Sequence, residues 1–142
     1  MCLVYHDVDK LMAMSDEDLS AHVAKCGEWV DDMQSGGRHP ICGALQAVST
    51  AATVRVRNGN LSVTDGPFAE TKEILGGFTI IEARDLTEAV QLAAKLDCAR
   101  VNTVEVRPML DPECVVSDPL DRRLVGIIDQ LQPSNIVDGR VR

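Results

Sequence analysis

The sequence has no long hydrophobic run and carries little positive charge. No apolar stretch approaches the roughly 18 residues that a membrane helix needs, and the opening MCLVYHDVDK lacks the basic and apolar segments of an export signal. Fourteen Lys and Arg face 22 Asp and Glu, which gives a net charge of −8. Because lysine and arginine neutralise the charges of nucleic acids and anionic lipids, we expect neither nucleic acid nor a membrane as a partner.

The five cysteines are an odd number, and none of them forms a C-x-x-C pair. They are widely spaced in a chain that is long enough to bury a core without disulfide bonds, which is typical of reduced thiols and predicts a cytoplasmic protein. His39-Pro40-Ile41-Cys42 and His6-Asp7-Val8-Asp9 offer metal ligands, but neither has the repeated spacing of a structural zinc site. We therefore predict no metal site and no cofactor.

Two segments have the start signals and the periodicity of helices. Ser15 followed by Asp18 is typical of a capping box, and a helix is expected from there to Gly36-Gly37. Asp85 followed by Glu88 predicts a second helix start. The expected apolar positions are Leu19, Val23, Cys26, Val30 and Met33 in the first helix, and Leu86, Ala89, Val90, Ala93 and Leu96 in the second.

Strands are predicted between and around these helices. Alternating residues on both sides of Asn58-Gly59 are the strongest short signal for a β-hairpin, because both turn positions need positive φ. The segment after Gly76-Gly77 is apolar on both faces, which is typical of a central strand. The expected strands are 2–6, 41–48 with a possible bulge at Gly43, 53–57, 61–63, 78–83 and 103–107.

This order predicts an α+β fold, a ferredoxin-like split βαβ arrangement with an inserted hairpin and both helices on one sheet face. The other face then lacks a cover, and we expect a second copy of the chain to hide it in a homodimer. Residues 1–110 would form this domain and 111–142 a C-terminal extension. A helix is expected at 120–131, with Leu124, Ile127 and Ile128 buried against the body or a partner.

Reactive polar groups are densest in residues 64–73, and from here the sequence is recognisable. The stretch VTDGPFAETKEILGGFTIIEARDLTEAVQLAAKLDCARVNTVEVRP closely resembles the DGPF branch of the YCII-related domain family, and the likeness spans roughly residues 2–110. The positions that match the family motif are Asp65, Gly66, Pro67, Phe68, Glu70, Lys72, Gly76, Gly77 and Phe78.

The resemblance implies a dimeric α+β barrel with a cavity between sheet and helices in each subunit, and a small-molecule enzymatic role. Relatives include a chlorinated-hydroxyquinone dehydrochlorinase, and some genes of the branch lie beside or fuse with sigma factors, so a protein partner is conceivable. Shorter family members place a His on the first helix beside an Asp. His22 lies about one helical turn from that position, and Cys26 stands where relatives often have an aromatic residue.

Asp65 is the first candidate for catalysis. A carboxylate at a strand end, followed by Gly-Pro, can be aimed into a cavity, and partial burial would raise its pKa toward that of a general base. Asp before Gly is also ordinary turn chemistry, in which the carboxylate accepts backbone amides, and this structural reading has somewhat more weight. Whether His22 or His6 assists Asp65 stays open.

Three further residues are candidates for substrate binding. Glu70 and Lys72 alternate in a loop, so they could pair with each other at the surface or bind a polar ligand. Tyr5 could donate to a substrate oxygen, although a partly buried structural tyrosine is commoner. Phe68 is expected to anchor its loop in the core, and Arg55 and Arg57 to lie on a solvated strand face.

These residues support three functions. The first is a cofactor-independent enzyme of the lyase or isomerase type, in which Asp65 takes a proton beside a carbonyl or phenol and a Tyr or Lys stabilises the oxyanion. The alternative is a non-catalytic small-molecule-binding or regulatory module that docks on a protein such as a sigma factor. The third is a structural dimer whose cavity is only packing.

Overall fold

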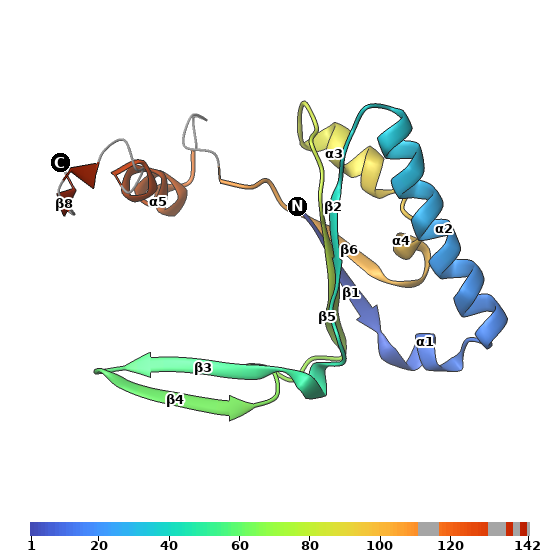
Figure 1. The fold of residues 1–142 in the computed structure, drawn as a ribbon, viewed down its shortest axis with the longest axis horizontal. Helices are drawn as coiled ribbons and strands as arrows, with labels where there is room; N and C mark the ends of the chain where they lie inside the picture. Colours follow the sequence, from blue (N-terminus) through green and yellow to red (C-terminus); the bar gives the residue numbers. More distant parts are fainter. Residues whose placement is uncertain (111–116, 131–135, 138–139, 142) are drawn as a thin grey trace. The chain divides into compact units, whose positions relative to one another are not determined.

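Four strands form one antiparallel sheet in the order β2-β5-β1-β6 (Figure 1). They are β1 (Cys2–Asp7), β2 (Ile41–Ala44), β5 (Glu73–Ile80) and β6 (Thr103–Val106). β5 separates β1 from β2, and β1 separates β5 from β6, so each strand-helix-strand unit is split by a strand of the other. This is the interleaved strand order that the sequence predicts for the α+β fold.

The structure is a computed structural model that describes residues 1–110, 117–130, 136–137 and 140–141. The chain divides into two units, Met1–Arg107 and Pro108–Arg142, and each is described by itself. Among the described residues, no helix has both the length and the apolar character that a membrane crossing requires.

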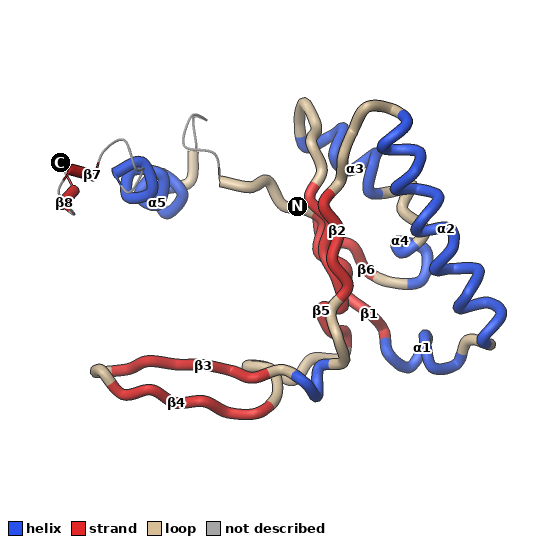
Figure 2. The backbone as a smooth tube through the Cα atoms, viewed as in Figure 1, coloured by secondary structure: helices blue, strands red, loops and turns tan. Residues whose placement is uncertain are grey.

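The helices of the first unit cover one face of the sheet (Figures 1 and 2). The long helix α2 (Asp16–Ser35) lies beside α3 (Leu86–Ala93), as the periodicity predicts. Three short helices were not predicted, because they are too short for an apolar period to show. These are α1 (Val8–Ala13), the 3-10 helix η1 (Val48–Thr50) and α4 (Cys98–Val101).

The start of α2 forms as predicted, but its buried face differs. Ser15 is the N-cap, and its hydroxyl oxygen accepts a hydrogen bond from the backbone amide of Asp18 at 3.1 Å. The buried residues of the helix are His22, Trp29 and Met33, whereas Val23 is 62% exposed. Of the five predicted apolar positions, Met33 is buried and Cys26 and Val30 are half-buried, whereas Leu19 and Val23 are exposed, and His22 takes a place that a hydrophobic residue would usually hold.

The core between α2 and the sheet is small. Val4, Trp29, Met33 and Leu96 are its buried members, with Trp29 donating its indole N–H to the carbonyl of Leu92 at 3.1 Å. Because that hydrogen bond satisfies the one polar group of the ring, Trp29 can be buried at no polar cost.

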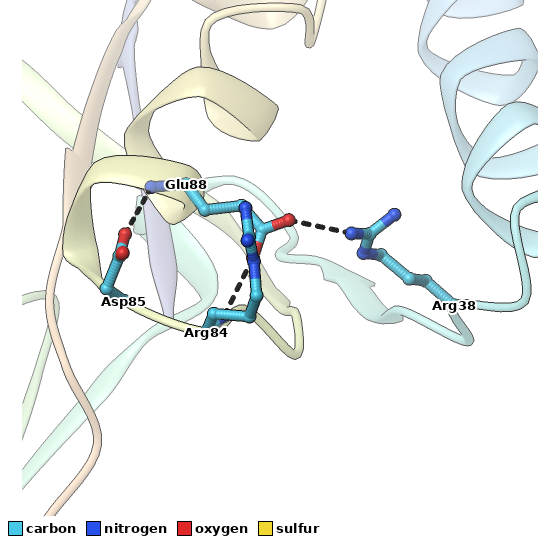
Figure 3. A network of polar contacts seen from close by, with 4 residues as sticks. All are labelled: Arg38, Arg84, Asp85 and Glu88. Atoms are coloured by element: carbon cyan, nitrogen blue, oxygen red, sulfur yellow. Dashed lines mark hydrogen bonds and ion pairs between the residues drawn. The ribbon is translucent and has the colours of Figure 1, made fainter.

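A polar network joins the ends of the two long helices (Figure 3). Asp85 is the N-cap of α3 and accepts the amide of Glu88 at 2.8 Å, as predicted. The Glu88 carboxylate in turn accepts from the backbone and side chain of Arg84, and from Arg38, which follows α2, at 2.8 Å. The hydrogen bonds from Arg84 hold the pKa of Glu88 below its ordinary value.

The central strand β5 is longer than predicted, and its glycines lie inside it. The strand begins at Glu73, not Phe78, and Gly76 has no partner on β1, where the register shifts between Val4 and Tyr5. The bulge therefore lies here and not at Gly43. Gly43 instead leaves room for the ring of Phe78, which an added Cβ would meet at 2.6 Å.

The inserted hairpin consists of β3 (Ala52–Arg57) and β4 (Asn60–Asp65), which pair with each other and with no other strand of the described residues. Asn58 and Gly59 have φ of 52° and 78°, the positive values that the predicted turn requires.

The second unit contains α5 (Pro119–Gln130), β7 (Ile136–Val137) and β8 (Arg140–Val141). The predicted helix at 120–131 is α5, with Leu131 outside the described residues. Leu124, Ile127 and Ile128 lie on it, and their burial against the body or a partner stays a prediction.

Candidate functional site

A mostly apolar hollow of about 300 Å³ lies between the sheet and α2. Its apolar wall includes residues from both layers: Val4, Leu19, Val23, Trp29, Val30 and Phe78. Its polar or reactive lining consists of His6, His22, Cys26, Cys42, Thr79, Cys98 and Asn102. The sequence predicts a cavity in this place, but with different functional residues.

His22 is held by a carboxylate from the other end of the domain. Its Nδ1 lies 2.8 Å from Oδ2 of Asp97, and both side chains are largely buried, with 8% and 14% of their surface exposed. The other carboxylate oxygen of Asp97 lies 3.2 Å from Arg100, one turn further along. Because an ionised carboxylate can only accept, such a carboxylate makes Nδ1 the donor of the shared hydrogen, and Nε2 is the ring nitrogen that Asp97 does not engage.

A second imidazole, His6, lines the same hollow from β1. It lies against the backbone of Gly76, where a Cβ would come within 2.6 Å of its Cγ, so the missing side chain at Gly76 makes room for the ring. Burial lowers the pKa of His6 below its ordinary value, and the neighbouring His22 lowers it further. His6 is therefore a neutral imidazole near pH 7, which can accept a proton.

Two half-buried thiols complete this end of the hollow. Cys26 lies one helical turn after His22 on α2, and its Sγ is 2.8 Å from that of Cys98 at the start of α4. Burial, together with the hydrogen bond that Cys98 shares with Cys26, raises the pKa of Cys98 to about 12. Ligand atoms of His22, Cys26 and Cys98 all lie within 4.8 Å of one another.

Asn102 ends α4 and offers a buried acceptor. The residue is 8% exposed and lines the hollow, yet its side-chain Oδ1 has no hydrogen-bond partner among the described residues. A buried polar atom without a partner costs free energy, on the order of 1–3 kcal/mol. A bound molecule that donates a hydrogen bond would remove that cost.

Asp65 lies elsewhere in the structure. It ends β4 opposite Ala52, its side chain is exposed, and it is not among the residues that line the hollow between sheet and helices. The corner after it is firmly held, because the Gly66 amide donates to Ala51 at 2.7 Å and Thr53 donates to the Gly66 carbonyl at 2.8 Å. The single chain thus has the stiff corner that the sequence indicates, without the predicted cavity at its carboxylate.

The three predicted binding residues are also outside the hollow. Tyr5 lines a second hollow, of about 590 Å³, at the base of the hairpin. Burial raises the pKa of Tyr5, and the neighbouring carboxylate of Glu105 raises it further. Glu70 and Lys72 are exposed loop residues, and no ion pair joins them in the described part of the chain. Phe68 is 81% exposed at the same second hollow, so the prediction of a core anchor is wrong for the single chain.

Sequence reasoning missed the pair of His22 and Asp97, together with Cys98. One signal was available, since His22 and Cys26 are four residues apart and must share a helix face. Asp97 and Cys98 carry no such signal. They lie more than 70 residues away, and only the packing of α4 beside α2 brings them to this face.

Comparisons with known proteins identify the family of this chain. The model of the YCII-related domain matches residues 1–112. An uncharacterized protein of Rhizobium meliloti (strain 1021) is 38% identical over 116 residues, which cover 75% of this chain and 88% of that protein. With the split strand order, the hollow and both of these matches in hand, we conclude that the chain belongs to the YCII-related domain family.

Proposed function

We propose that the hollow is the active site of a small-molecule enzyme of the lyase or isomerase type, and that His22 transfers the proton. The observation that carries this proposal is the 2.8 Å contact between His22, which lines the apolar hollow, and the largely buried Asp97. An imidazole oriented by a buried carboxylate is a general base with a fixed tautomer. The proposal assigns to His22 the role that sequence reasoning gave to Asp65.

The chemistry follows from the position of each group. Nε2 of His22 takes a proton from a carbon or hydroxyl of the substrate, and Asp97 stabilises the imidazolium that forms. The proton then returns to another position of the product, or leaves with the leaving group. His6 is a second neutral imidazole in the same hollow, and Oδ1 of Asn102 can accept a hydrogen bond from a substrate hydroxyl.

The substrate class follows from the lining. A hollow of about 300 Å³ with mostly apolar walls fits a small ring or short chain with few polar groups. A phenol, a hydroquinone or an enolisable ketone combines an apolar body with a proton that a neutral imidazole can remove. We therefore propose such compounds as substrates.

A panel of phenols, chlorinated hydroquinones and enolisable ketones tests this proposal. Compounds are scored for consumption and for a rise in melting temperature in protein treated with a chelator. The wild type is compared with His22→Gln, Asp97→Asn and Asp65→Asn. We expect His22→Gln to lower turnover by about 10²–10⁴-fold, the usual contribution of a general base, while compounds still raise its melting temperature. Asp65→Asn should match the wild type.

Two results would reject the assignment. A loss of turnover in Asp65→Asn with His22→Gln active would return the base to Asp65. Compounds that stabilise the wild type and are never consumed would favour the alternative, a binding module, because stabilisation by mass action needs no chemistry.

We also propose that the chain forms a homodimer, as its family resemblance implies. The hairpin places four apolar side chains on one face, through the cross-strand pairs Val54 with Val63 and Val56 with Leu61, and all four are at least 57% exposed. A two-stranded hairpin is marginally stable alone in water. The helices α2, α3 and α4 all lie on one face of the four-stranded sheet, so no helix of the first unit covers the opposite face (Figure 1). A second copy can cover both surfaces.

Light scattering on a sizing column tests the dimer. Val56→Glu should shift the wild-type mass toward that of a monomer, because it places a charge on the apolar hairpin face. Arg55→Glu is the matched control on the opposite face and should leave the mass unchanged. A wild-type monomer, or equal behaviour of the two variants, would contradict this proposal.

Three finer assignments also stay proposals. The motif Asp65-Gly66-Pro67-Phe68 supports membership of the DGPF branch, and the free cysteines among the described residues support a cytoplasmic location. We further propose residues 1–110 as the functional domain and 111–142 as an extension. Activity and thermal stability of a chain ending at residue 110 test this division.

A further inference from the structure

Three side chains that bind soft or borderline metal ions converge at one end of the hollow. They are His22 and Cys26 from one face of α2, and Cys98 from the start of α4, with ligand atoms within 4.8 Å of one another. One imidazole and two thiolates are a ligand set that zinc takes in enzymes, where a fourth position stays open for water or substrate. A hydrogen bond between the two thiols accounts for the closeness of Cys26 and Cys98, but not for the third ligating side chain, His22.

We propose that His22, Cys26 and Cys98 bind a thiophilic divalent cation such as zinc, with its fourth position open to the hollow. Each donor is a type that zinc prefers, and calcium and magnesium, which require oxygen ligands, are excluded by the same set. The spacing supports the proposal, because residues four apart on a helix present their ligand atoms on the same side.

The surroundings of His22 favour a metal ligand. A histidine that binds zinc almost always donates its other ring N–H to a carboxylate or carbonyl, which fixes the tautomer. Asp97 accepts from Nδ1 of His22 at 2.8 Å, so Nε2 is the atom left to bind the ion. Asp97 is itself held by Arg100 at 3.2 Å, which completes the outer contacts of the ligand.

Charge balance permits the ion to lie in an apolar hollow. A divalent cation with two thiolates and a neutral imidazole has no net charge, so the loaded site avoids the large cost of burying an isolated ion. Zinc–sulfur bonds of about 2.3 Å in a tetrahedral site hold two sulfurs about 3.8 Å apart. The sulfurs of Cys26 and Cys98, now 2.8 Å apart, therefore separate by about 1 Å on binding.

The open position faces groups suited to a bound water or substrate. His6 and Asn102 line the same hollow, and Oδ1 of Asn102 is the buried acceptor without a partner. A metal-bound water is a hydrogen-bond donor, so it satisfies an acceptor of this kind within reach.

This inference goes beyond the proposed function, because the ion takes the lone pair at Nε2 that serves as the base in the metal-free protein. In the loaded protein Nε2 of His22 would no longer be a proton acceptor, and the bound ion would supply Lewis-acid chemistry instead. The two proposals can fail separately, because metal binding is measured without substrate and the general base is tested in protein treated with a chelator.

Cobalt(II) is the probe for this site. The reduced, metal-free full chain is titrated anaerobically with Co²⁺, and the absorption spectrum reports thiolate-to-cobalt charge transfer and tetrahedral coordination. We expect one Co²⁺ per chain with both signatures, displaced by Zn²⁺ and not by Mg²⁺. Cys26→Ser and Cys98→Ser should each reduce the charge-transfer intensity per bound cobalt to about half, because one of two thiolates is lost.

Two variants separate the site from general effects of mutation. Cys42→Ser removes another thiol of the same hollow and should retain the full spectrum, because Cys42 is outside the cluster. Asp97→Asn keeps all three ligands and should weaken metal binding by about 10–100-fold, as the loss of an outer-shell partner does. Far-ultraviolet circular dichroism confirms that each variant is folded.

The outcomes decide the inference. Charge-transfer bands that Cys26→Ser and Cys98→Ser reduce and Cys42→Ser retains support it. Absence of the bands in folded, reduced wild-type protein overturns it, as does a spectrum that Cys42→Ser abolishes. A Cys26–Cys98 disulfide in freshly purified protein, found by mass spectrometry without reductant, also overturns it, because the pair would then be a covalent bridge.

Discussion

Replacing Gly76 with alanine tests how the sheet positions His6. Gly76 lies in β5 at the bulge, without a partner on β1, and the imidazole of His6 occupies the space above its backbone. A Cβ at Gly76 would lie 2.6 Å from Cγ of His6, and three ring atoms would be closer than the 3.0 Å that real Cβ atoms essentially never show. The ring must therefore move, or the strand must shift.

The expected cost is that of an overpacked core. An added methyl that forces side chains from their rotamers or shifts a backbone typically costs about 1–3 kcal/mol. With a urea m-value of about 1–3 kcal/mol per M for a small protein, the unfolding midpoint should fall by about 1 M. Gly27→Ala is the control, because Gly27 is inside α2 with no atom within 4 Å of an added Cβ. That change should stabilise the protein by about 0.5–1 kcal/mol.

A double-mutant cycle assigns the cost to the His6 ring. In a His6→Ala background the clash partner is absent, so Gly76→Ala should cost little, and the coupling should be about 1–3 kcal/mol. Urea unfolding followed by the fluorescence of Trp29, the single tryptophan, measures all four proteins. An equal cost of Gly76→Ala with and without the His6 ring would refute the reasoning, and so would a Gly76→Ala protein as stable as Gly27→Ala.

Three further predictions follow from single residues. Burial, and after it the electrostatic effect of the neighbouring His22, lowers the pKa of His6 below its ordinary 6.5. The unfolded chain therefore binds this proton more readily, and stability that is present above pH 6.5 is lost as the pH falls through the folded-state pKa. Urea midpoints at about pH 7.5 and 5.5 should therefore differ less in His6→Ala than in the wild type, and an unchanged difference would remove His6 as the cause. Asp85→Ala deletes the N-cap acceptor of α3 and should cost about 1 kcal/mol, and a cost near zero in urea unfolding would show that the cap is not needed. Trp29→Ala should cost about 3–5 kcal/mol in thermal unfolding and Trp29→Phe clearly less, and equal losses would contradict the packing described here.

The elements of the first unit could be predicted where their signals are local. The hairpin depends on two adjacent residues, Asn58 and Gly59, which adopt positive φ more readily than other residue types do. The helix starts depend on the caps Ser15 and Asp85, which act within three residues. The predicted elements were wrong where a helix is short, as α4 is, or where a glycine makes room for a distant side chain, as Gly76 does for His6.

The candidate site could not be predicted in the same way. Asp65 stands out in the sequence because a carboxylate before Gly-Pro is a recognisable local pattern, yet its place on the exposed end of β4 depends on where the hairpin points. In the sequence, His22 is one of many polar residues of an amphipathic helix. Its importance is visible only when Asp97 and Cys98 lie beside it.

The sequence by itself determined the order of strands and helices, the caps, the turn and the family, because each of these depends on residues that are neighbours in the chain. Only the tertiary structure decided which polar groups share the hollow. Contacts such as those of His22 with Asp97 and of Cys26 with Cys98 join residues more than 70 positions apart, and they form because the split strand order packs α4 against α2.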